Sequence, residues 1–264
     1  MDRIEELIKR VRQLRPIDDA MFKKLAESKA VCQEILRVIL NDKKLIVEEV
    51  ISEDSIANIF GRAVRLDALC TLGNGMLCNI EIKKENVNDD VRRVRYNASS
   101  IVSRFSEKGQ KFSEIPDVIV VYISEYDVFR LGRTIYHIDS VIRETNTTVD
   151  DGLSRVFVNT QYADTDNTDV GELMKCFLQK EIDNDKFPEL SDRLSYFKND
   201  GKGVDSMCDI IKEYADERAA EMLVNNIETL AKKIGTVEEA CDMLNITEQQ
   251  YEDAKALLEK TLTV

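Results

Sequence analysis

Apolar residues recur at helical spacing through the first forty positions of the chain, whereas later segments alternate as strands do. The spacing predicts an amphipathic helix over residues 2–14, a second helix after Pro16 and a third helix capped by Ser28. The apolar run at 44–52 then predicts a strand. Three helices are therefore expected before the first strand.

The even-numbered residues of the segment 64–82 are apolar on either side of a glycine-containing turn at 73–75. This pattern predicts a hairpin whose even face contacts the core. Because residues paired across strands share a face, the two numbers of each pair must have an even sum. A two-residue loop would give a sum of 149, whereas a three-residue loop with Gly75 in the left-handed conformation gives 148. The predicted register therefore places Asp67 directly opposite Glu81.

The other face of this hairpin carries Asp67, Glu81 and Lys83. Two carboxylates opposite each other in a sheet are destabilising by about 0.2–1 kcal/mol, so this face requires solvent or a cation. Mg²⁺ binds through one or two carboxylates, keeps several waters and lowers the pKa of a bound water, as phosphodiester hydrolysis requires. Lys83 would orient the attacking water or stabilise charge on the phosphate. From the spacing alone, a solvated face in which Lys83 neutralises the two acids is the commoner interpretation.

The segments after the hairpin predict an α/β core. An apolar stripe that begins at the cap Asn88 predicts a helix as far as residue 106, and the apolar run at 117–123 predicts a strand covered on both faces. Weaker patterns downstream predict strands at 134–142 and 153–161, a polar loop at 143–152, helices at 171–179 and 189–198, and a linker at 199–203.

Charge is distributed unevenly along the 264 residues. The net charge of −13 argues against a generic nucleic-acid coat, because such binding neutralises phosphates. Most of the excess lies in residues 205–264, which have 14 acidic and 6 basic residues and predict acidic helices capped by Thr236 and Thr247. Residues 92–111 have six basic residues against one acidic residue. That segment could face a polyanion or be a solvated basic face.

The cysteines and the single histidine do not form a metal-binding or disulfide pattern. The six cysteines are scattered without a CxxC pair, so reduced and mostly buried thiols are expected. His137 is expected to be structural rather than a general base. No apolar run approaches the roughly 18 residues of a membrane span, so no membrane partner is expected and the chain is placed in the cytoplasm.

The motif Asp67 … Glu81-Ile82-Lys83, followed by a helix and a buried strand, resembles the catalytic core of the PD-(D/E)XK nuclease superfamily. The segments PIDDAMFKKLAES, GRAVRLDALCTLGNGMLCNIEIKK, RRVRYNASSIV and DVIVVYISEYDVFRLG more closely resemble PD-(D/E)XK nuclease family transposases, the Rpn-type recombination-promoting nucleases. The resemblance implies a restriction-endonuclease-like α/β fold, a mixed central sheet flanked by helices. The implied domains are a nuclease-like domain at 1–200 and an acidic helical C-terminal extension at 201–264.

The same resemblance implies roles for individual residues of the hairpin. Asp67 and Glu81 would bind Mg²⁺, or alternatively Mn²⁺, the backbone carbonyl of Ile82 would add a ligand, and Lys83 would be the catalytic lysine. Many relatives have Glu-x-Gln where this chain has Glu81-Ile82-Lys83, so its catalytic set is complete. The proline that is common before the first aspartate is absent here.

Two further groups of residues are implied outside the hairpin. Asp19 matches a recurrent acidic position of the family, with Asp18 beside it, although acids of a helix N-terminus are the commoner interpretation of both residues. The Arg95-Tyr96 pair matches a family motif on the helix that follows the hairpin. Phosphate contacts are expected from that helix. The full set of candidate nucleic-acid contacts is Arg92, Arg93, Arg95, Tyr96 and Arg104.

The implied function is that of a bacterial Mg²⁺-dependent DNA endonuclease that contacts the DNA backbone and leaves a 3′-hydroxyl. It would serve recombination, transposition or defence. The alternative is a catalytically inactive nuclease-fold scaffold whose acidic C-terminal helices dock a protein partner. A nuclease directed at RNA shares every site residue, and a homodimer is compatible with each of these functions.

Overall fold

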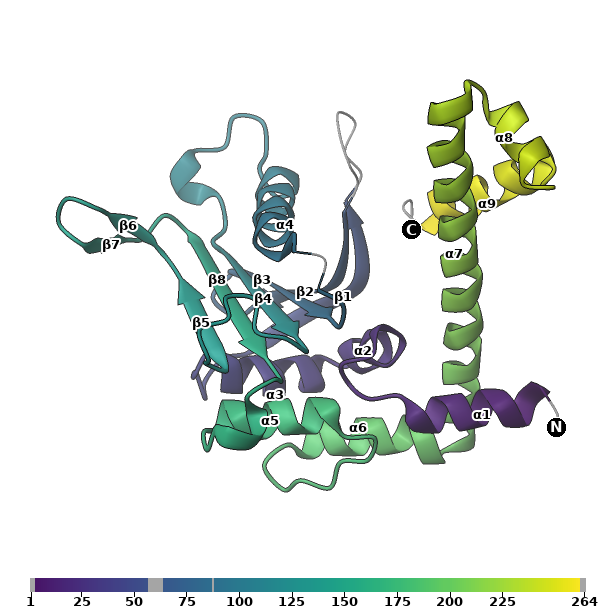
Figure 1. The fold of residues 1–264 in the computed structure, drawn as a ribbon. Helices are drawn as coiled ribbons and strands as arrows, with labels where there is room; N and C mark the ends of the chain where they lie inside the picture. Colours follow the sequence, from purple (N-terminus) through teal and green to yellow (C-terminus); the bar gives the residue numbers. More distant parts are fainter. Residues whose placement is uncertain (1–2, 57–63, 87, 262–264) are drawn as a thin grey trace.

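Six strands form one mixed sheet in the part of the chain that the computed structural model describes, residues 3–56, 64–86 and 88–261 (Figure 1). In spatial order the strands are β1 (Val47–Ile56), β2 (Val64–Leu72), β3 (Leu77–Lys83), β4 (Val118–Ser124), β8 (Leu153–Asn159) and β5 (Ile135–Ile138). Strands β3, β4 and β8 run parallel, and the other neighbours are antiparallel. A parallel centre of this kind requires helical crossovers that cover the sheet.

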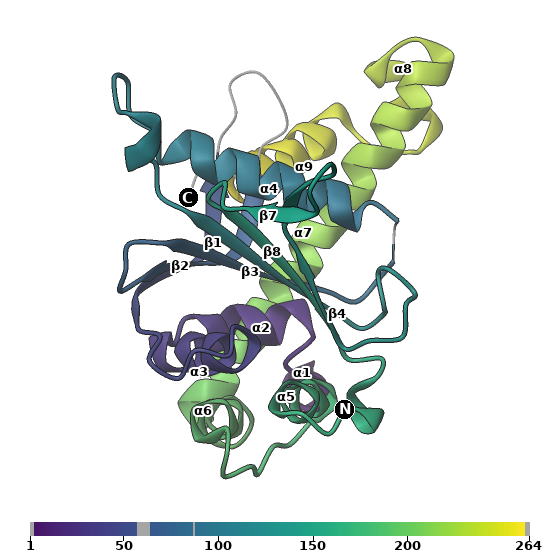
Figure 2. The same cartoon turned by 90° about the vertical axis from the view of Figure 1, so that its left-hand side faces the viewer.

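Helices cover both faces of the sheet (Figure 2). One face packs against α4 (Asp90–Arg104). The other face packs against α2 (Asp19–Ala26) and α3 (Lys29–Ile39). Helices α5 (Asp169–Leu178) and α6 (Pro188–Asn199) pack against α3, and α1 (Arg3–Gln13) packs against α6. Short 3₁₀ helices lie at Phe112–Glu114 and Ala163–Thr165. The expected α/β architecture, a mixed sheet flanked by helices, is confirmed.

The predicted hairpin register is confirmed. The pairs between β2 and β3 run from Thr71–Leu77 to Ala68–Ile80, and the two numbers of each pair sum to 148. Gly75 has a φ of 83°, the left-handed conformation that the three-residue loop requires. The register of the apolar face was therefore sufficient to predict the turn.

The odd-numbered face of the hairpin, which carries Asp67 and Glu81, is not solvated. The commoner interpretation of its charges from the sequence was a solvated face. Even-numbered residues such as Cys70 and Ile80 lie in the large cluster beneath the sheet, as predicted. Odd-numbered Leu69 and Leu77 lie in a second buried cluster, which α4 completes with Val94 and other apolar residues. Because β3 is a central strand, both of its faces are buried, and polar side chains on the α4 face are withdrawn from bulk water.

Two local predictions need correction. Helix α4 has Asp89 rather than Asn88 as its N-cap, because Asn88 takes a left-handed φ of 58° and donates its N–H to the Asn86 side chain. The loop at 143–152 contains strand β7 (Thr147–Val149), which pairs with β6 (Ser140–Ile142) in a projecting hairpin. Neither change affects the central sheet. The cap of α3 at Ser28 is confirmed.

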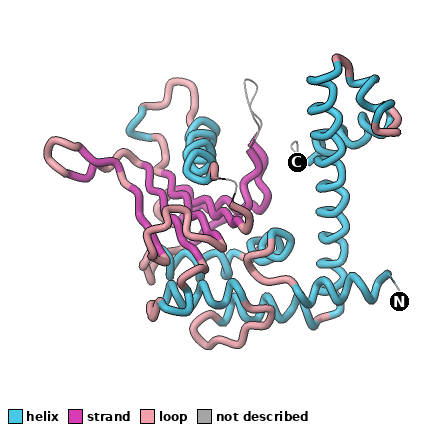
Figure 3. Tube along the Cα trace, in the orientation of Figure 1, coloured by secondary structure: helices cyan, strands magenta, loops and turns pink. Residues whose placement is uncertain are grey.

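The predicted linker at 199–203 is instead the start of a long helix (Figure 3). Helix α7 (Gly201–Ile234) begins directly after α6, since the Asp200 side chain caps it by accepting hydrogen bonds from Lys202 N and Gly203 N. A Cβ at Gly203 would lie 2.2 Å from the carbonyl oxygen of Tyr196. The glycine therefore permits close helix packing rather than flexibility.

Helix α7 leads into α8 (Val237–Met243) and α9 (Glu248–Thr261), which confirms a helical C-terminal region. The predicted caps Thr236 and Thr247 are also confirmed, because each side chain accepts a backbone hydrogen bond at the start of its helix. The three helices share a small buried cluster of their own, Val224, Ile227, Ala240, Cys241 and Tyr251.

All six cysteines are buried free thiols, as expected. No helix within the described ranges has the length and apolar character to cross a membrane.

Candidate active site

Asp67 and Glu81 meet where strands β2 and β3 separate. The backbone ladder ends at Ala68–Ile80, one position before these two residues would pair. Beyond that point the backbone N–H of Asp67 donates to Glu81 Oε1 at 3.4 Å, and the N–H of Ile82 donates to Asp67 Oδ2 at 2.8 Å. Each carboxylate therefore accepts a hydrogen bond from the other residue's strand. The predicted proximity of the two acids is observed, with side-chain bonds in place of a continued ladder.

Strand β1 is irregular at the same level of the sheet. Its pairs with β2 pass from Ser52–Ala68 to Asp54–Leu66, and Glu53, between these pairs, has a left-handed φ of 52°. On β2 itself, Ala68 lies in the large cluster beneath the sheet, and strict alternation would place Leu66 there as well. Leu66 instead lies in the cluster under α4. A left-handed φ such as that of Glu53 is uncommon in non-glycine residues, and residues with it concentrate at functional sites. Hydrophobic alternation alone did not reveal this change of face.

Glu81 is held by polar side chains beneath α4. Its carboxylate is buried, and Oε1 also accepts a hydrogen bond of 2.8 Å from Asn79 Nδ2. Asn97 of α4 donates a further side-chain hydrogen bond, and the positive charge of Arg93 acts on the same carboxylate. Sequence reasoning missed Asn79 and Asn97. The available signal was a polar residue two positions before Glu81 in a strand that is otherwise apolar.

Burial changes the pKa of both carboxyl groups. The pKa of Glu81 rises from 4.5 to about 7, chiefly because burial disfavours the charge, although the hydrogen bond from Asn79 opposes this rise. The pKa of Asp67 lies well above 3.8, first because of burial and then because of the neighbouring Glu81 charge. Two such groups in contact carry an unfavourable negative charge that a divalent cation would offset.

We expect Glu81→Gln to raise the free energy of unfolding, and the gain should grow with pH. Because the pKa of Glu81 is higher in the folded protein, the folded state binds more protons between pH 4.5 and about 7, and stability falls as pH rises through that window. Glutamine avoids this loss, so the gain should be small at pH 4.5 and reach about 3 kcal/mol above pH 7. Urea denaturation in EDTA at low and high pH measures both values, and an equal gain at both would contradict the assignment.

Asp19 acts electrostatically on Asp67 and is itself acted on by Lys83, whereas Asp18 is engaged elsewhere. Lys83 is half-buried at the end of β3. Burial raises the pKa of Asp19, and the charges of Lys83 and Lys84 oppose this rise. The Asp19 charge in turn contributes to the raised pKa of Asp67. Asp18 accepts hydrogen bonds from Arg15 N at 2.6 Å and from Lys84 Nζ at 2.5 Å. Of the two acids predicted at this position, Asp19 is the one whose charge reaches the site.

The predicted cations of α4 separate into two groups. Arg93 is half-buried and forms an ion pair with Asp89 at 3.4 Å, and its positive charge acts on the Glu81 carboxylate. Arg92, Arg95 and Arg104 are exposed on the outer surface of the helix. Tyr96 packs against the cluster beneath α4 and is half-buried.

Helix α7 contributes side chains to the border of the site. Glu217 forms an ion pair of 3.0 Å with Arg65, two residues before Asp67 on β2. Tyr214 donates a hydrogen bond of 3.0 Å to Glu53, and its pKa is raised by burial and by the charges of Glu53 and Asp67. These residues are far from the motif in sequence and were not predicted.

The donor set fits a Mg²⁺ ion held largely by water. Mg²⁺ needs only one or two protein carboxylates, which Asp67 and Glu81 supply, and Asp67 Oδ1 accepts no hydrogen bond from the described residues. No cluster of three or more histidine, cysteine or acidic side chains with a metal-binding arrangement occurs within those residues. The arrangement therefore fits an oxygen-ligated, hydrated cation and not a closed structural metal site.

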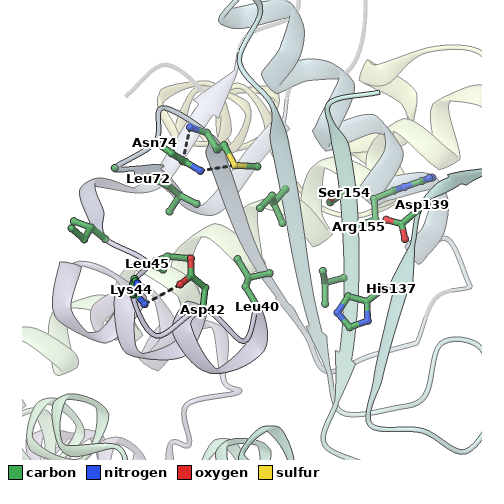
Figure 4. A pocket seen from close by; sticks show the side chains of 15 residues that line it. Leu40, Asp42, Lys44, Leu45, Leu72, Asn74, His137, Asp139, Ser154 and Arg155 are labelled. Carbon is green, nitrogen blue, oxygen red and sulfur yellow. Dashed lines mark hydrogen bonds between the residues drawn. The ribbon is translucent and has the colours of Figure 1, made fainter. Parts of the chain in front are cut away.

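A cavity of about 630 Å³ lies at the other end of the strands (Figure 4). It is bordered by the hairpin turn at Asn74, the end of α3 near Leu40 and the start of β8 at Arg155. His137 lines this cavity and is exposed, so the single histidine is remote from the carboxylate pair. None of the predicted catalytic residues borders the cavity.

One of three comparisons with known proteins identifies a family. A comparison with curated proteins found no match, and a comparison with solved structures found none. The family model described as PD-(D/E)XK nuclease family transposase matches residues 16–260, which include the carboxylate pair, Lys83 and most of the C-terminal helices. Membership in this family supports a nuclease-type function. The chain belongs to the PD-(D/E)XK nuclease family transposases.

Proposed function

We propose that this chain is a Mg²⁺-dependent endonuclease that hydrolyses phosphodiester bonds of DNA. The observation that carries the proposal is the pair formed by Asp67 and Glu81, with Lys83 following on β3. The Glu81 carboxylate accepts a hydrogen bond from Asp67 N, and the Asp67 carboxylate accepts one from Ile82 N. A merely solvated face would not be buried under α4, and it would not raise the pKa of Glu81 to about 7. Family membership supports the same chemistry.

Each residue of the site has a role in this proposal. Asp67 and Glu81 would hold the Mg²⁺, which supplies a Lewis acid for the phosphate and lowers the pKa of a bound water. Asp19 adds negative charge at the border of the site, where it would help to bind the hydrated cation. Lys83, beside Asp19, would stabilise negative charge that develops on the phosphate or orient the attacking water. The backbone carbonyl of Ile82 is proposed as a further ligand.

DNA binding would rest on backbone contacts from α4. Arg92, Arg95 and Arg104 are exposed on α4, where a DNA backbone could approach them, and such contacts position DNA without reading its sequence. Arg93 and Tyr96 are proposed to support this helix from its inner side. The protein is proposed to act in the bacterial cytoplasm in recombination, transposition or defence.

Removal of the metal provides the direct test. Supercoiled plasmid incubated with the protein at low salt should be nicked in MgCl₂, and EDTA should stop the reaction because the carboxylates alone cannot activate water. Agarose gel electrophoresis follows the conversion to open circles, and labelled single-stranded RNA in parallel separates a preference for DNA from one for RNA. Absence of cleavage in both Mg²⁺ and Mn²⁺ would favour the scaffold alternative, in which the acidic helices α7–α9 dock a protein partner.

A further inference from the structure

Asn79 is a buried amide whose position relative to Glu81 is defined by the strand. It lies two residues before Glu81 on β3, so both side chains leave the same face of the sheet. Asn79 is 0% exposed, and its Nδ2 donates to Glu81 Oε1 at 2.8 Å. The amide is therefore in direct contact with the carboxylate at a depth that bulk water does not reach.

Asn97 approaches the same carboxylate from the opposite layer. It is 4% exposed on the inner face of α4 and donates a side-chain hydrogen bond to Glu81. One amide thus comes from the strand and the other from the helix above it. Two donors from different elements restrict the torsion angles of the glutamate side chain more strongly than either donor alone.

The cost of this arrangement is visible at the other end of the Asn79 amide. Its Oδ1 is buried and has no hydrogen-bond partner in the described part of the chain. Leaving a buried acceptor unpaired is destabilising, and an apolar residue would pack beside Leu77 without that loss. Packing alone therefore does not explain an asparagine at this position, whereas its contact with Glu81 does.

We propose that Asn79 and Asn97 are positioning residues that hold the Glu81 carboxylate in the orientation needed for metal binding. This inference rests on the proposed function, since it assigns a role toward the same Mg²⁺ site. Asn79 Nδ2 and the backbone N–H of Asp67 both donate to the same oxygen, Glu81 Oε1. Partners of this kind, which orient a metal ligand without touching the metal, typically change metal affinity by about 10–100-fold when they are removed.

The test compares Mg²⁺ affinity in the full-length protein and its leucine variants. Asn79→Leu and Asn97→Leu keep the approximate shape of the side chain but remove the donor. Each should weaken Mg²⁺ binding by about 10–100-fold, measured by isothermal titration calorimetry with MgCl₂. Plasmid cleavage should recover most of its rate at saturating Mg²⁺, because the amides act on binding of the metal and not on the phosphate.

Asn159 provides a matched control for a buried amide outside the site. It is 2% exposed on β8, two strands from β3, and its Nδ2 donates to the carbonyl oxygens of Arg133 and Thr134 at 2.7 and 3.2 Å. Its Oδ1 is also buried without a partner. Asn159→Leu should therefore lower thermal stability but leave the Mg²⁺ affinity within about twofold of the wild type.

The outcomes separate the positioning role from the proposed function. Wild-type Mg²⁺ affinity in both leucine variants, with weaker binding in Glu81→Gln, would overturn the positioning role alone. Absence of saturable Mg²⁺ binding by the wild type would overturn the proposed function together with the positioning role. If Asn79→Leu does not fold, Asn97→Leu carries the test, because leucine is a good helix former and α4 should persist.

Discussion

Glu81→Gln should lower the rate of Mg²⁺-dependent plasmid cleavage by at least about 10³-fold, while the protein becomes more stable. Glutamine has the shape of glutamate and keeps an oxygen that can accept the Asn79 hydrogen bond, so the β3–α4 packing should survive. It lacks the charge that binds the cation. Loss of activity together with a gain in stability is typical of a residue whose buried charge is retained for function.

The informative comparison for this variant is Asp127→Asn. Asp127 is also buried, but its carboxylate accepts hydrogen bonds from Tyr136 and Gly132, and these bonds lower its pKa. Its replacement should reduce stability and leave cleavage within a few-fold of the wild type. Initial rates from a plasmid gel and midpoints from urea denaturation distinguish the two variants. Wild-type cleavage by Glu81→Gln would remove this carboxylate from the active site.

Lys83→Ala should reduce cleavage by about 10²–10³-fold, with a smaller effect on Mg²⁺ affinity. Lys83 is two residues after Glu81 on β3, and its charge acts on Asp19. In the proposed mechanism, its ammonium would act on a phosphate bound at the carboxylate pair. Loss of one charge that stabilises the reacting phosphate acts on the chemical step. The fall should therefore appear in the cleavage rate at saturating Mg²⁺ and saturating plasmid.

Lys84→Ala is the matched control for this effect. Lys84 is the adjacent lysine, just beyond the end of β3. Its Nζ pairs with Asp18 at 2.5 Å, and its charge also acts on Asp19. Its removal costs at most a surface ion pair, about 0–1 kcal/mol, and should change cleavage only a few-fold. Equal losses in the two variants would show that general positive charge is important there, rather than the specific position of Lys83.

The location of the site was predictable because local rules determine it. Parity of the apolar residues on β2 and β3 allowed one register, and the left-handed Gly75 completed it, so the proximity of Asp67 and Glu81 followed from about twenty residues. The charges of that hairpin then indicated the chemistry. The resemblance to a known family added the order of the surrounding elements, which the structure confirms.

The surroundings of the site could not be predicted from the same rules, because they depend on contacts distant in sequence. The cover of α4 over β3 turns an expected solvated face into a buried one, and that burial raises the pKa of Glu81. Tyr214 and Glu217 approach from a helix more than a hundred residues away. Glycines at 201 and 203 indicated a linker, although Gly203 serves close packing of α6 and α7.

The order of strands across the sheet also constrains the route by which the chain folds. Strand β5 pairs with β8, which follows it in sequence and separates it from β4. During synthesis β5 must therefore wait for β8, whereas the β1–β2–β3 meander can form from neighbouring segments and requires little loop closure. Asp67 and Glu81 are only 14 residues apart within that meander. The two acids can thus meet early, before the sheet that will bury them is complete.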